Sequence, residues 1–354
     1  MKKIIPIVIA VVLVASLFAA SCAPEEEEEA IPTTITIVDS AGTVVEVPQP
    51  LERIAFWDVA TAEVSRALGV QDKFVGINEY IITYYSHFWP ELQDKPTIGS
   101  YVNPDYEKVI DVEPQVIFTI VGYPPDAEEQ LEPAGIKVIR MKFSHPDNLT
   151  RDIITLGLIL GKEEEAKEFA SFLQSKLDFI EEMVQEIEPE DRKTVYFEAG
   201  HKDYYARGPG SVEAELLDKA GGINIFADLG VSGSEVDPEE ILVRDPDVIL
   251  KDTMGATYGG YTATDTSDME AKRDEMMSRP GWSELKAIKD GQVYIRGGDL
   301  YGPKVVIYLC YVAKIIYPDR FEDLDVEAFH REYLEKYQDL EFKGIYVYPC
   351  PWVE

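Results

Sequence analysis

Residues 163–188 read EEEAKEFASFLQSKLDFIEEMVQEIE, and the rest of the chain is organised around this stretch. Apolar side chains recur every three or four residues, which is the spacing of one helix face; they are Ala166, Phe169, Ala170, Leu173, Leu177, Ile180, Val184 and Ile187. No Gly or Pro interrupts the stretch before Pro189. A helix of this length spans roughly 39 Å, so we expect it to run along two lobes rather than within one.

The segments on the two sides of this helix repeat one pattern. Residues 103–118 and 237–250 each contain a helix that starts beside a Pro, then a second Pro and an apolar strand. Residues 63–69 and 215–221 each carry a Glu six residues before a Gly that ends a helix. Because the two kinds of segment occur in the same order in both halves, we predict two similar lobes with a cleft between them as the binding site.

Predicted strands alternate with short helices in both halves of the chain. The predicted strands are residues 53–56, 73–77, 116–121, 136–141, 194–197, 248–250 and 292–295, preceded by a strand, a Gly turn and a strand within 33–47. Such alternation is typical of parallel sheets with crossover helices. The predicted fold class is therefore α/β, with mainly parallel sheets in two lobes and one long joining helix. We place the first lobe at 33–147, the connecting helical segment at 148–190 and the second lobe at 191–354.

The N-terminus has the pattern of an export signal. Lys2 and Lys3 precede an apolar run and small residues that end before Cys22, and the run is too short to favour a membrane span. Cys22 stands where the lipobox of bacterial lipoproteins has its lipidated Cys, so we predict a signal peptide over 1–21 and a lipid on Cys22. The alternative is an ordinary signal with a coincidental Cys. The glutamate-rich residues 22–32 then form an acidic tether.

Composition excludes some partners. The formal net charge is −33, which opposes binding to nucleic acid and to anionic lipid. After Cys22 only Cys310 and Cys350 remain, and the sequence leaves open whether they form a disulfide or whether Cys310 is a buried thiol in its apolar run.

An ordered set of short matches covers about residues 33–316 and resembles the substrate-binding lipoproteins of ABC importers for iron complexes and cobalamin. The matching pieces lie at residues 35–47, 50–54, 63–76, 114–117, 208–212, 220–224, 245–249, 282–287 and 291–294, with Gly161 leading into the long helix. The resemblance implies a class III periplasmic binding protein that is not an enzyme. It also implies a monomer, anchored by lipid on the outer face of the cell membrane, with an ABC permease and its ATPase as partners.

In the family that the chain resembles, one glutamate at the outer tip of each lobe docks onto arginines of the permease. Glu63 matches this position in the first lobe, and both Glu213 and Glu215 are near it in the second. The internal repeat favours Glu215, because it aligns with Glu63. Two solvated helix glutamates are the simpler alternative.

Ligand-binding residues of such folds lie on loops that follow strand ends. In the first lobe the candidates are Trp57, Asp58, Tyr80, Tyr84, Tyr85, Tyr101 and Tyr123. In the second lobe they are His201, Tyr204, Tyr205, Arg207, Tyr258, Arg296 and Tyr301. Tyr rings bury a flat or bulky ligand, and the two arginines could clamp its carboxylates or phosphate. Packing is the alternative role for each single Tyr.

The four histidines, His87, His145, His201 and His330, are not spaced as a metal site, so we expect no intrinsic metal or cofactor. We expect His330 at the surface of a C-terminal helix. His87 and His201 are expected to face the cleft from opposite lobes, as candidate axial ligands of haem iron or cobalt or as non-coordinating side chains.

The expected ligand is an iron chelate such as an iron–siderophore, with cobalamin and haem as alternatives. A chelatase-like enzyme is disfavoured because the α/β part has no cysteines before Cys310 and no phosphate loop or catalytic triad. A lipoprotein that only senses or adheres is the third alternative.

Overall fold

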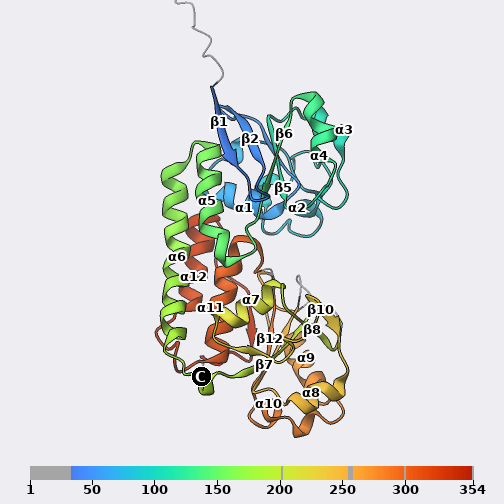
Figure 1. Cartoon of the computed structure of the whole chain (residues 1–354), viewed down its shortest axis with the longest axis vertical. Helices are drawn as coiled ribbons and strands as arrows, with labels where there is room; N and C mark the ends of the chain where they lie inside the picture. The colour runs from blue at the N-terminus through green and yellow to red at the C-terminus, as the bar shows by residue number, and fades with distance from the viewer. Residues whose placement is uncertain (1–32, 201, 254–257, 299, 353–354) are drawn as a thin grey trace, which may run out of the picture. The chain divides into compact units, whose positions relative to one another are not determined.

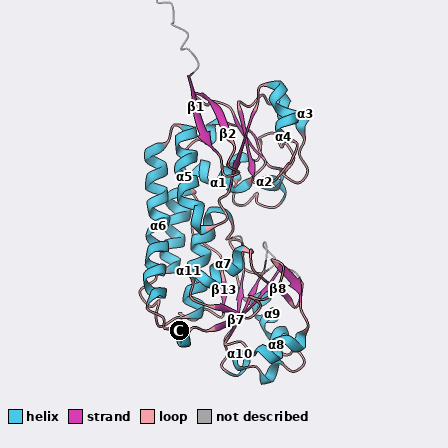
Figure 2. Ribbon diagram, in the orientation of Figure 1, coloured by secondary structure: helices cyan, strands magenta, loops and turns pink. Residues whose placement is uncertain are grey.

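The computed structural model describes residues 33–352, except His201, residues 254–257 and Asp299. The predicted signal peptide, the lipidated Cys22 and the acidic tether lie outside the described residues. Residues Thr33–Glu354 make one compact unit by their contacts. Within it, one sheet comes from the first half of the chain and a second from the other half, with a group of helices beside both (Figures 1 and 2).

The first sheet has the strand order β4-β3-β5-β6, and all neighbours are parallel. Its strands are β3 (Ile54–Phe56), β4 (Phe74–Gly76), β5 (Val116–Ile120) and β6 (Lys137–Met141). The helices that connect them are α1 (Val59–Ala67), α2 (Glu79–Thr83), α3 (Tyr106–Asp111) and α4 (Ala127–Leu131). Parallel strands bring their carboxyl ends to one edge, and the loops after β3 and β5 therefore lie together.

A separate hairpin, β1 (Thr33–Val38) and β2 (Val44–Gln49), precedes this sheet. Asp39 closes its turn, because one carboxylate oxygen accepts from the backbone N–H groups of Ala41 and Thr43, both at 2.9 Å. The other oxygen accepts from the backbone N–H of Arg140 at 3.1 Å. The same side chain thus shapes the turn and attaches the hairpin to β6.

Two helices, rather than one, connect the lobes. α5 (Pro146–Leu160) and α6 (Glu163–Gln185) pack along each other, with the left-handed Gly161 (φ 65°) between them. Gly157 of α5 lies so close to Ala166 of α6 that a Cβ at Gly157 would overlap the Ala166 methyl group. The apolar face predicted for the long helix is mostly buried, and Figure 1 shows α6 running beside α5, α11 and α12.

The second sheet has the order β10-β8-β7-β11-β12-β13, and β9 also pairs with β7. Its strands are β7 (Thr194–Ala199), β8 (Tyr205–Arg207), β9 (Ile223–Asn224), β10 (Gly233–Glu235), β11 (Val248–Asp252), β12 (Val293–Arg296) and β13 (Val347–Tyr348). The parallel part, β9-β7-β11-β12, has the same order as β4-β3-β5-β6, which agrees with the predicted repeat. The antiparallel strands β8, β10 and β13 were not predicted.

The helices of the second half are α7 (Val212–Lys219), α8 (Pro238–Arg244), α9 (Ser267–Met277), α10 (Lys286–Lys289), α11 (Val305–Ile316) and α12 (Val326–Glu332), which a π-helical turn, η8 (Tyr333–Tyr337), extends. Every residue of α11 is buried, because it packs against α6, α7 and α12. Cys310 of α11 forms no disulfide with Cys350, and burial raises the pKa of its thiol to about 12. The buried thiol is therefore the alternative that the structure supports.

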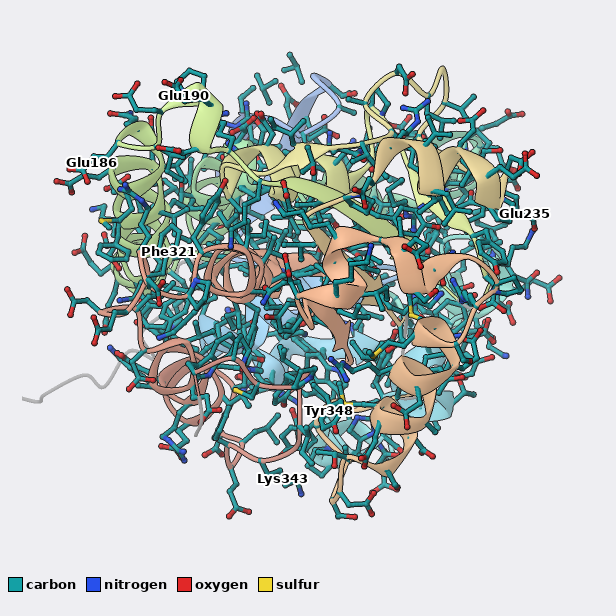
Figure 3. All side chains as sticks on the ribbon, turned by 90° about the horizontal axis from the view of Figure 1, so that it is seen from below. Glu186, Glu190, Glu235, Phe321, Lys343 and Tyr348 are labelled. Atoms are coloured by element: carbon teal, nitrogen blue, oxygen red, sulfur yellow. The ribbon has the colours of Figure 1, made fainter. Side chains whose placement is uncertain are left out.

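Several charged side chains lie at the surface of the protein. In Figure 3, Glu186, Glu190, Glu235 and Lys343 lie at the periphery of the view. Among the described residues, no helix combines the length and apolar composition that crossing a membrane requires.

Candidate functional site

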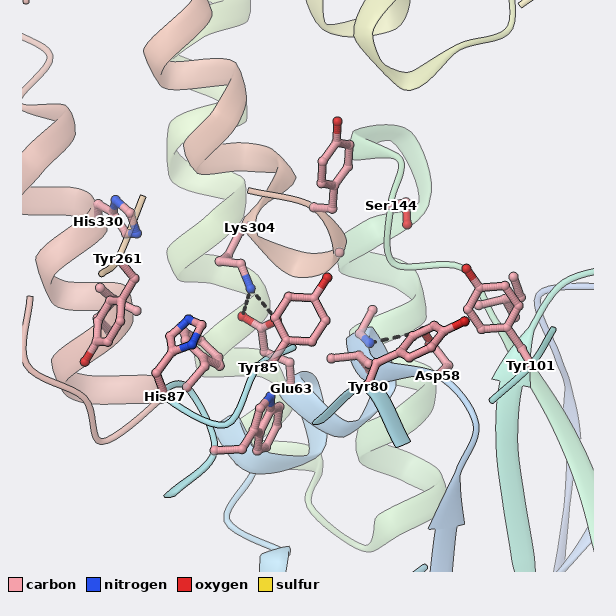
Figure 4. Close-up of a pocket in the computed structure, with 18 of the residues that line it drawn as sticks. Asp58, Glu63, Tyr80, Tyr85, His87, Tyr101, Ser144, Tyr261, Lys304 and His330 are labelled. Carbon is pink, nitrogen blue, oxygen red and sulfur yellow. Dashed lines mark hydrogen bonds and ion pairs between the residues drawn. The ribbon is translucent and has the colours of Figure 1, made fainter. Parts of the chain in front are cut away.

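A cavity of about 280 Å³ lies between the first lobe and residues that follow position 260 (Figure 4). The first half of the chain supplies Asp58, Val59, Ala60, Glu63, Tyr80, Tyr85, His87, Phe88, Trp89, Tyr101, Ile120 and Ser144. The second half supplies Tyr261, Tyr301, Gly302, Lys304, His330, Leu334 and Tyr346. Aromatic side chains make up about half of this lining, which suits a ligand with flat or apolar faces.

Asp58 is the second residue after β3 and the N-cap of α1. Its carboxylate accepts hydrogen bonds from the backbone N–H groups of Ala60 (3.1 Å) and Thr61 (3.0 Å) and from Thr61 Oγ1 (2.6 Å). Burial raises the pKa of Asp58, because it disfavours the charged form. The side chain is therefore fixed by the helix that it caps, at the edge of the cavity.

Trp57 is buried beside the site, and its side chain does not line the cavity. The side chain is fully buried, and its indole Nε1–H donates to the carbonyl of Ile98 at 2.8 Å. The Trp57 carbonyl accepts from the side-chain amide of Asn78, whose own oxygen caps α2 by accepting from the N–H of Tyr80. Successive residues of an extended chain point to opposite faces, so Asp58 reaches the cavity and Trp57 does not.

The first-lobe tyrosines divide into an inner and an outer group. Tyr80, Tyr85 and Tyr101 line the cavity, as predicted. Tyr84 and Tyr123 do not line it; they are 67% and 53% exposed and contact the rings of Tyr80 and Tyr101 at centroid distances of 5.4 and 6.2 Å. Burial raises the pKa of the Tyr101 hydroxyl.

Most of the predicted second-lobe residues contact other parts of the protein and do not line the cavity. Arg296 is fully buried in an ion pair with Asp252, and Arg207 pairs with Glu213 at 3.2 Å. Neither arginine lines the cavity, so the predicted clamp on anionic groups of the ligand is not formed. Both guanidinium groups instead neutralise buried carboxylates, since an unpaired buried charge is costly.

The predicted second-lobe tyrosines and His201 also fall mainly outside the cavity. Tyr204 packs under the guanidinium group of Arg279 at 4.5 Å, and Tyr205 and Tyr258 do not line the cavity either. His201 lies outside the described residues. Tyr301 alone of this predicted set lines the cavity, and its hydroxyl donates to Asp252 at 2.8 Å.

Ser144, Lys304, Leu334 and Tyr346 also line the cavity and were not among the predicted site residues. Lys304 follows Tyr301 on the turn η7 (Gly302–Lys304), and its Nζ lies 2.5 and 2.6 Å from the two carboxylate oxygens of Glu63. Ser144 follows β6 and so obeys the strand-end rule that located the other first-lobe residues.

His330 is not at the surface, so that prediction was wrong. The side chain is 1% exposed, and its ring lies 4.4 Å from the ring of Tyr346 and its Nδ1 3.3 Å from the hydroxyl of Tyr311. Burial lowers the pKa of the imidazole to about 3, with the nearby charge of Lys304 as a second cause. His330 falls on the apolar stripe of α12 and η8 together with Phe329 and Tyr333, and this periodicity in the sequence indicates burial.

The glutamates considered for docking have different environments. Glu63 is 3% exposed and bonded to Lys304, and Glu213 is 3% exposed and paired with Arg207. The burial of Glu63 argues against our expectation that it stands at an outer tip. Glu215 lines a surface groove of about 420 Å³, and its Oε2 lies 2.6 Å from Nδ1 of His145. In the described part of the chain its Oε1 has no hydrogen-bond partner.

Within the described residues, no three His, Cys, Asp or Glu side chains come together in a way that could hold a metal ion. A cavity between two lobes of the same topology, lined from both halves of the chain, is the architecture of a two-lobed binding protein.

Residues 54–300 match the periplasmic binding protein family, and the chain therefore belongs to this family. The ABC transporter substrate-binding lipoprotein YvrC of Bacillus subtilis is 26% identical over 329 residues, which are 89% of this chain and 98% of YvrC. A vitamin B12-binding protein of Vibrio cholerae is 23% identical over 253 residues, 71% of this chain and 83% of that protein.

Among solved structures, the TroA-like periplasmic binding protein FepB from Veillonella parvula superimposes with a TM-score of 0.75 at 26% identity, and covers 88% of this chain and 99% of its own. The predicted class III fold is thus confirmed, and the chain is a substrate-binding protein of the ABC transporter class.

Proposed function

We propose that this protein captures a compact metal chelate, an iron–siderophore or related iron complex, in the cavity between its lobes and delivers it to an ABC permease. The observation that carries the proposal is the cavity itself, because its aromatic lining comes from both halves of the chain. A ligand bound there would contact both lobes at once, as capture by a two-lobed protein requires. The alternative ligands are cobalamin, which the Vibrio cholerae relative is named for, and haem.

The charge of the cavity limits the ligand. Lys304 is the one Lys or Arg among the described lining residues, and its ammonium group already pairs with Glu63. Asp58 adds a second carboxyl group to the lining, and Arg296 and Arg207, the two arginines expected to contact the ligand, are neutralised by Asp252 and Glu213. A strongly anionic chelate would lose its hydration without gaining a cation, so an uncharged or cationic complex fits better.

The size of the cavity also favours a compact ligand. Sites for small molecules are usually about 300–1,000 Å³, and a cavity of about 280 Å³ lies just below this range. A corrinoid would bind only after the lobes separated. A compact iron chelate is therefore our first choice, and haem and cobalamin are the alternatives that a titration must exclude.

We further propose that delivery uses Glu215 rather than Glu63 as the contact with the permease. Glu215 lines a surface groove with a side chain that is 23% exposed, and its buried Oε1 atom has no hydrogen-bond partner within the described part of the chain, so a rotation of the side chain would offer this oxygen to an arginine of another protein. Glu63 would have to leave Lys304 before it could play such a role.

The remaining parts of the proposal concern the protein's place in the cell. We propose that the mature protein begins at Cys22, carries a lipid there and acts as a monomer on the outer face of the membrane, with the acidic residues 22–32 as its tether. The name of the YvrC relative as a lipoprotein supports this anchor. Because the family binds substrates, we propose no catalytic activity.

The test is a titration of the soluble protein, begun at Ala23, with ferrichrome, haemin and cyanocobalamin, followed by absorbance and tryptophan fluorescence. Trp89 lines the cavity, whereas Trp57 and Trp282 are buried away from it. We expect saturable, micromolar or tighter quenching by one ligand, reduced in Trp89→Phe and kept in Trp282→Phe. Equal quenching in the two variants, or no binding by the folded protein, would contradict the proposed site.

A further inference from the structure

The last part of the chain, residues 318–348, contacts the first lobe directly. We call this part the C-terminal segment. The hydroxyl of Tyr333 donates to Glu63 Oε1 of α1 at 2.6 Å. The side chain of Gln338 donates to the Glu63 carbonyl at 3.4 Å, and the Gln338 carbonyl accepts from Arg66 at 3.3 Å. The segment is thereby attached to the helix that Asp58 caps at the cavity edge.

The same segment is also part of the second lobe. β13 pairs with β12 through Ile295↔Tyr348 and Arg296↔Val347. The backbone N–H of Gly297 donates to the carbonyl of Tyr346 at 2.9 Å. A chain of this length that is bonded to both lobes cannot move without breaking contacts on one side, so it holds a fixed position next to the cavity.

A third set of contacts joins the segment to the connecting helix. The rings of Phe329 and Phe172 lie 4.6 Å apart, and those of Tyr337 and Phe169 lie 4.7 Å apart. Leu324 and Leu334, both 1% exposed, belong to the same core. Because the side chains of this core are closely packed, we expect that shortening one of them leaves an empty space that its neighbours do not fill.

Three residues of the segment, His330, Leu334 and Tyr346, line the cavity. None of them carries a charge at neutral pH, since burial keeps the His330 imidazole unprotonated. The segment lies beyond residue 300, where the match to the periplasmic binding protein family ends. Part of the cavity wall therefore comes from outside residues 54–300.

We propose that the C-terminal segment is the specificity-determining wall of the cavity: His330, Leu334 and Tyr346 set how large the facing part of the ligand can be and require it to be uncharged. The proposal rests on the proposed function, because it assumes that the ligand of the cavity is a metal chelate. It restricts the class of ligands to uncharged complexes that place an apolar or aromatic face against this wall.

Two buried leucines of the segment provide a matched test. Leu334→Ala and Leu324→Ala remove the same atoms from equally buried side chains, but only Leu334 lines the cavity. The probes are ferric tris(acetohydroxamate) and ferric tris(benzohydroxamate), two uncharged complexes that differ by methyl and phenyl groups. The measured quantity is the ratio of their dissociation constants in the wild-type protein and in each variant.

We expect Leu334→Ala to shift this ratio toward the larger complex by at least about tenfold, and Leu324→Ala to leave it within about twofold. Leu334→Phe, which keeps the site filled if the Ala variant does not fold, should shift the ratio in the opposite direction. Equal ratios in all folded variants, with binding intact, would overturn the wall proposal alone. If the wild-type protein bound neither complex nor any of ferrichrome, haemin and cyanocobalamin, the proposed function would fail and the wall proposal with it.

Discussion

Lys304 and Glu63 form a buried ion pair that joins the turn before α11 to helix α1. The ammonium nitrogen lies 2.5 and 2.6 Å from the two carboxylate oxygens, and both side chains are less than 10% exposed. Tyr333 donates to the same carboxylate at 2.6 Å. Each charge is therefore matched by its partner, although the pair faces a cavity.

Breaking this pair should destabilise the protein more than removing it entirely. Lys304→Met leaves the Glu63 carboxylate buried and unpaired, which costs about 3–5 kcal/mol. In Lys304→Met with Glu63→Gln no charge remains, and the amide still accepts from Tyr333, so we expect most of this loss to be recovered. Urea denaturation of the two single variants and the double variant measures the coupling energy.

Additive losses in this cycle would show that the two charges do not interact in solution. Lys272→Met is a suitable control, because Lys272 pairs with Asp203 and Glu275 at partly exposed positions. We expect it to cost about 1 kcal/mol or less.

The N-cap of α1 should depend on the oxygen atoms of Asp58 rather than on its charge. Asp58→Ala removes the acceptor for the N–H groups of Ala60 and Thr61 and should cost about 1–2 kcal/mol. Asp58→Asn keeps an acceptor, and since burial raises the pKa of Asp58 the charge adds little to stability. Thermal denaturation should therefore rank the Asn variant close to the wild type. An Asn variant as unstable as the Ala variant would contradict this reasoning.

Glu215 should affect delivery without affecting capture. We expect Glu215→Gln to bind ligand with unchanged affinity, because this residue is absent from the cavity lining. In vesicles that contain the partner permease and its ATPase, the same variant should stimulate ATP hydrolysis several-fold less than the wild type. Glu239→Gln, which changes an exposed glutamate of α8, is the control. Equal stimulation by both variants would remove Glu215 from the docking proposal.

Local sequence signals were sufficient for the repeated part of the fold, with the exception of the two-residue strand β9 (Ile223–Asn224), which was not predicted. Short apolar runs, separated by helices that begin at Pro or end at Gly, predicted the other parallel strands of the two sheets. Examples are α8, which begins at a Pro, and α7, which is followed by Gly221. β10 and β13 consist of three and two residues, Gly233–Glu235 and Val347–Tyr348, and carry no pattern that the sequence reveals. Such strands form only because a partner strand is already present.

The position of a residue at the cavity was predictable where it depends on the local order of strands and loops. Asp58 and Tyr101 face the cavity from loops of the first lobe, as expected from the strand-end rule. Arg296 is the last residue of β12, but Asp252, far away in sequence, neutralises it. Pairing of this kind depends on tertiary structure and leaves no signal in the local sequence.

The buried His330 makes stability depend on pH in a definite direction. Its pKa is lowered from 6.5 to about 3 in the folded protein, chiefly by burial. Between these values the unfolded chain binds a proton that the folded protein does not, so acid favours unfolding. The contribution of His330 is fully present above about pH 6.5 and is lost progressively as the pH falls toward 3.

We therefore expect the free energy of unfolding to fall by about 2 kcal/mol more in the wild type than in His330→Gln when the pH is lowered from 7 to 5. The measurement is urea denaturation of both proteins at several pH values, because their difference cancels the titration of the many carboxylates. His330→Gln has no titrating ring, and its amide can still meet the hydroxyl of Tyr311, which lies 3.3 Å from Nδ1. Parallel stability curves for the two proteins would mean that His330 becomes protonated in place.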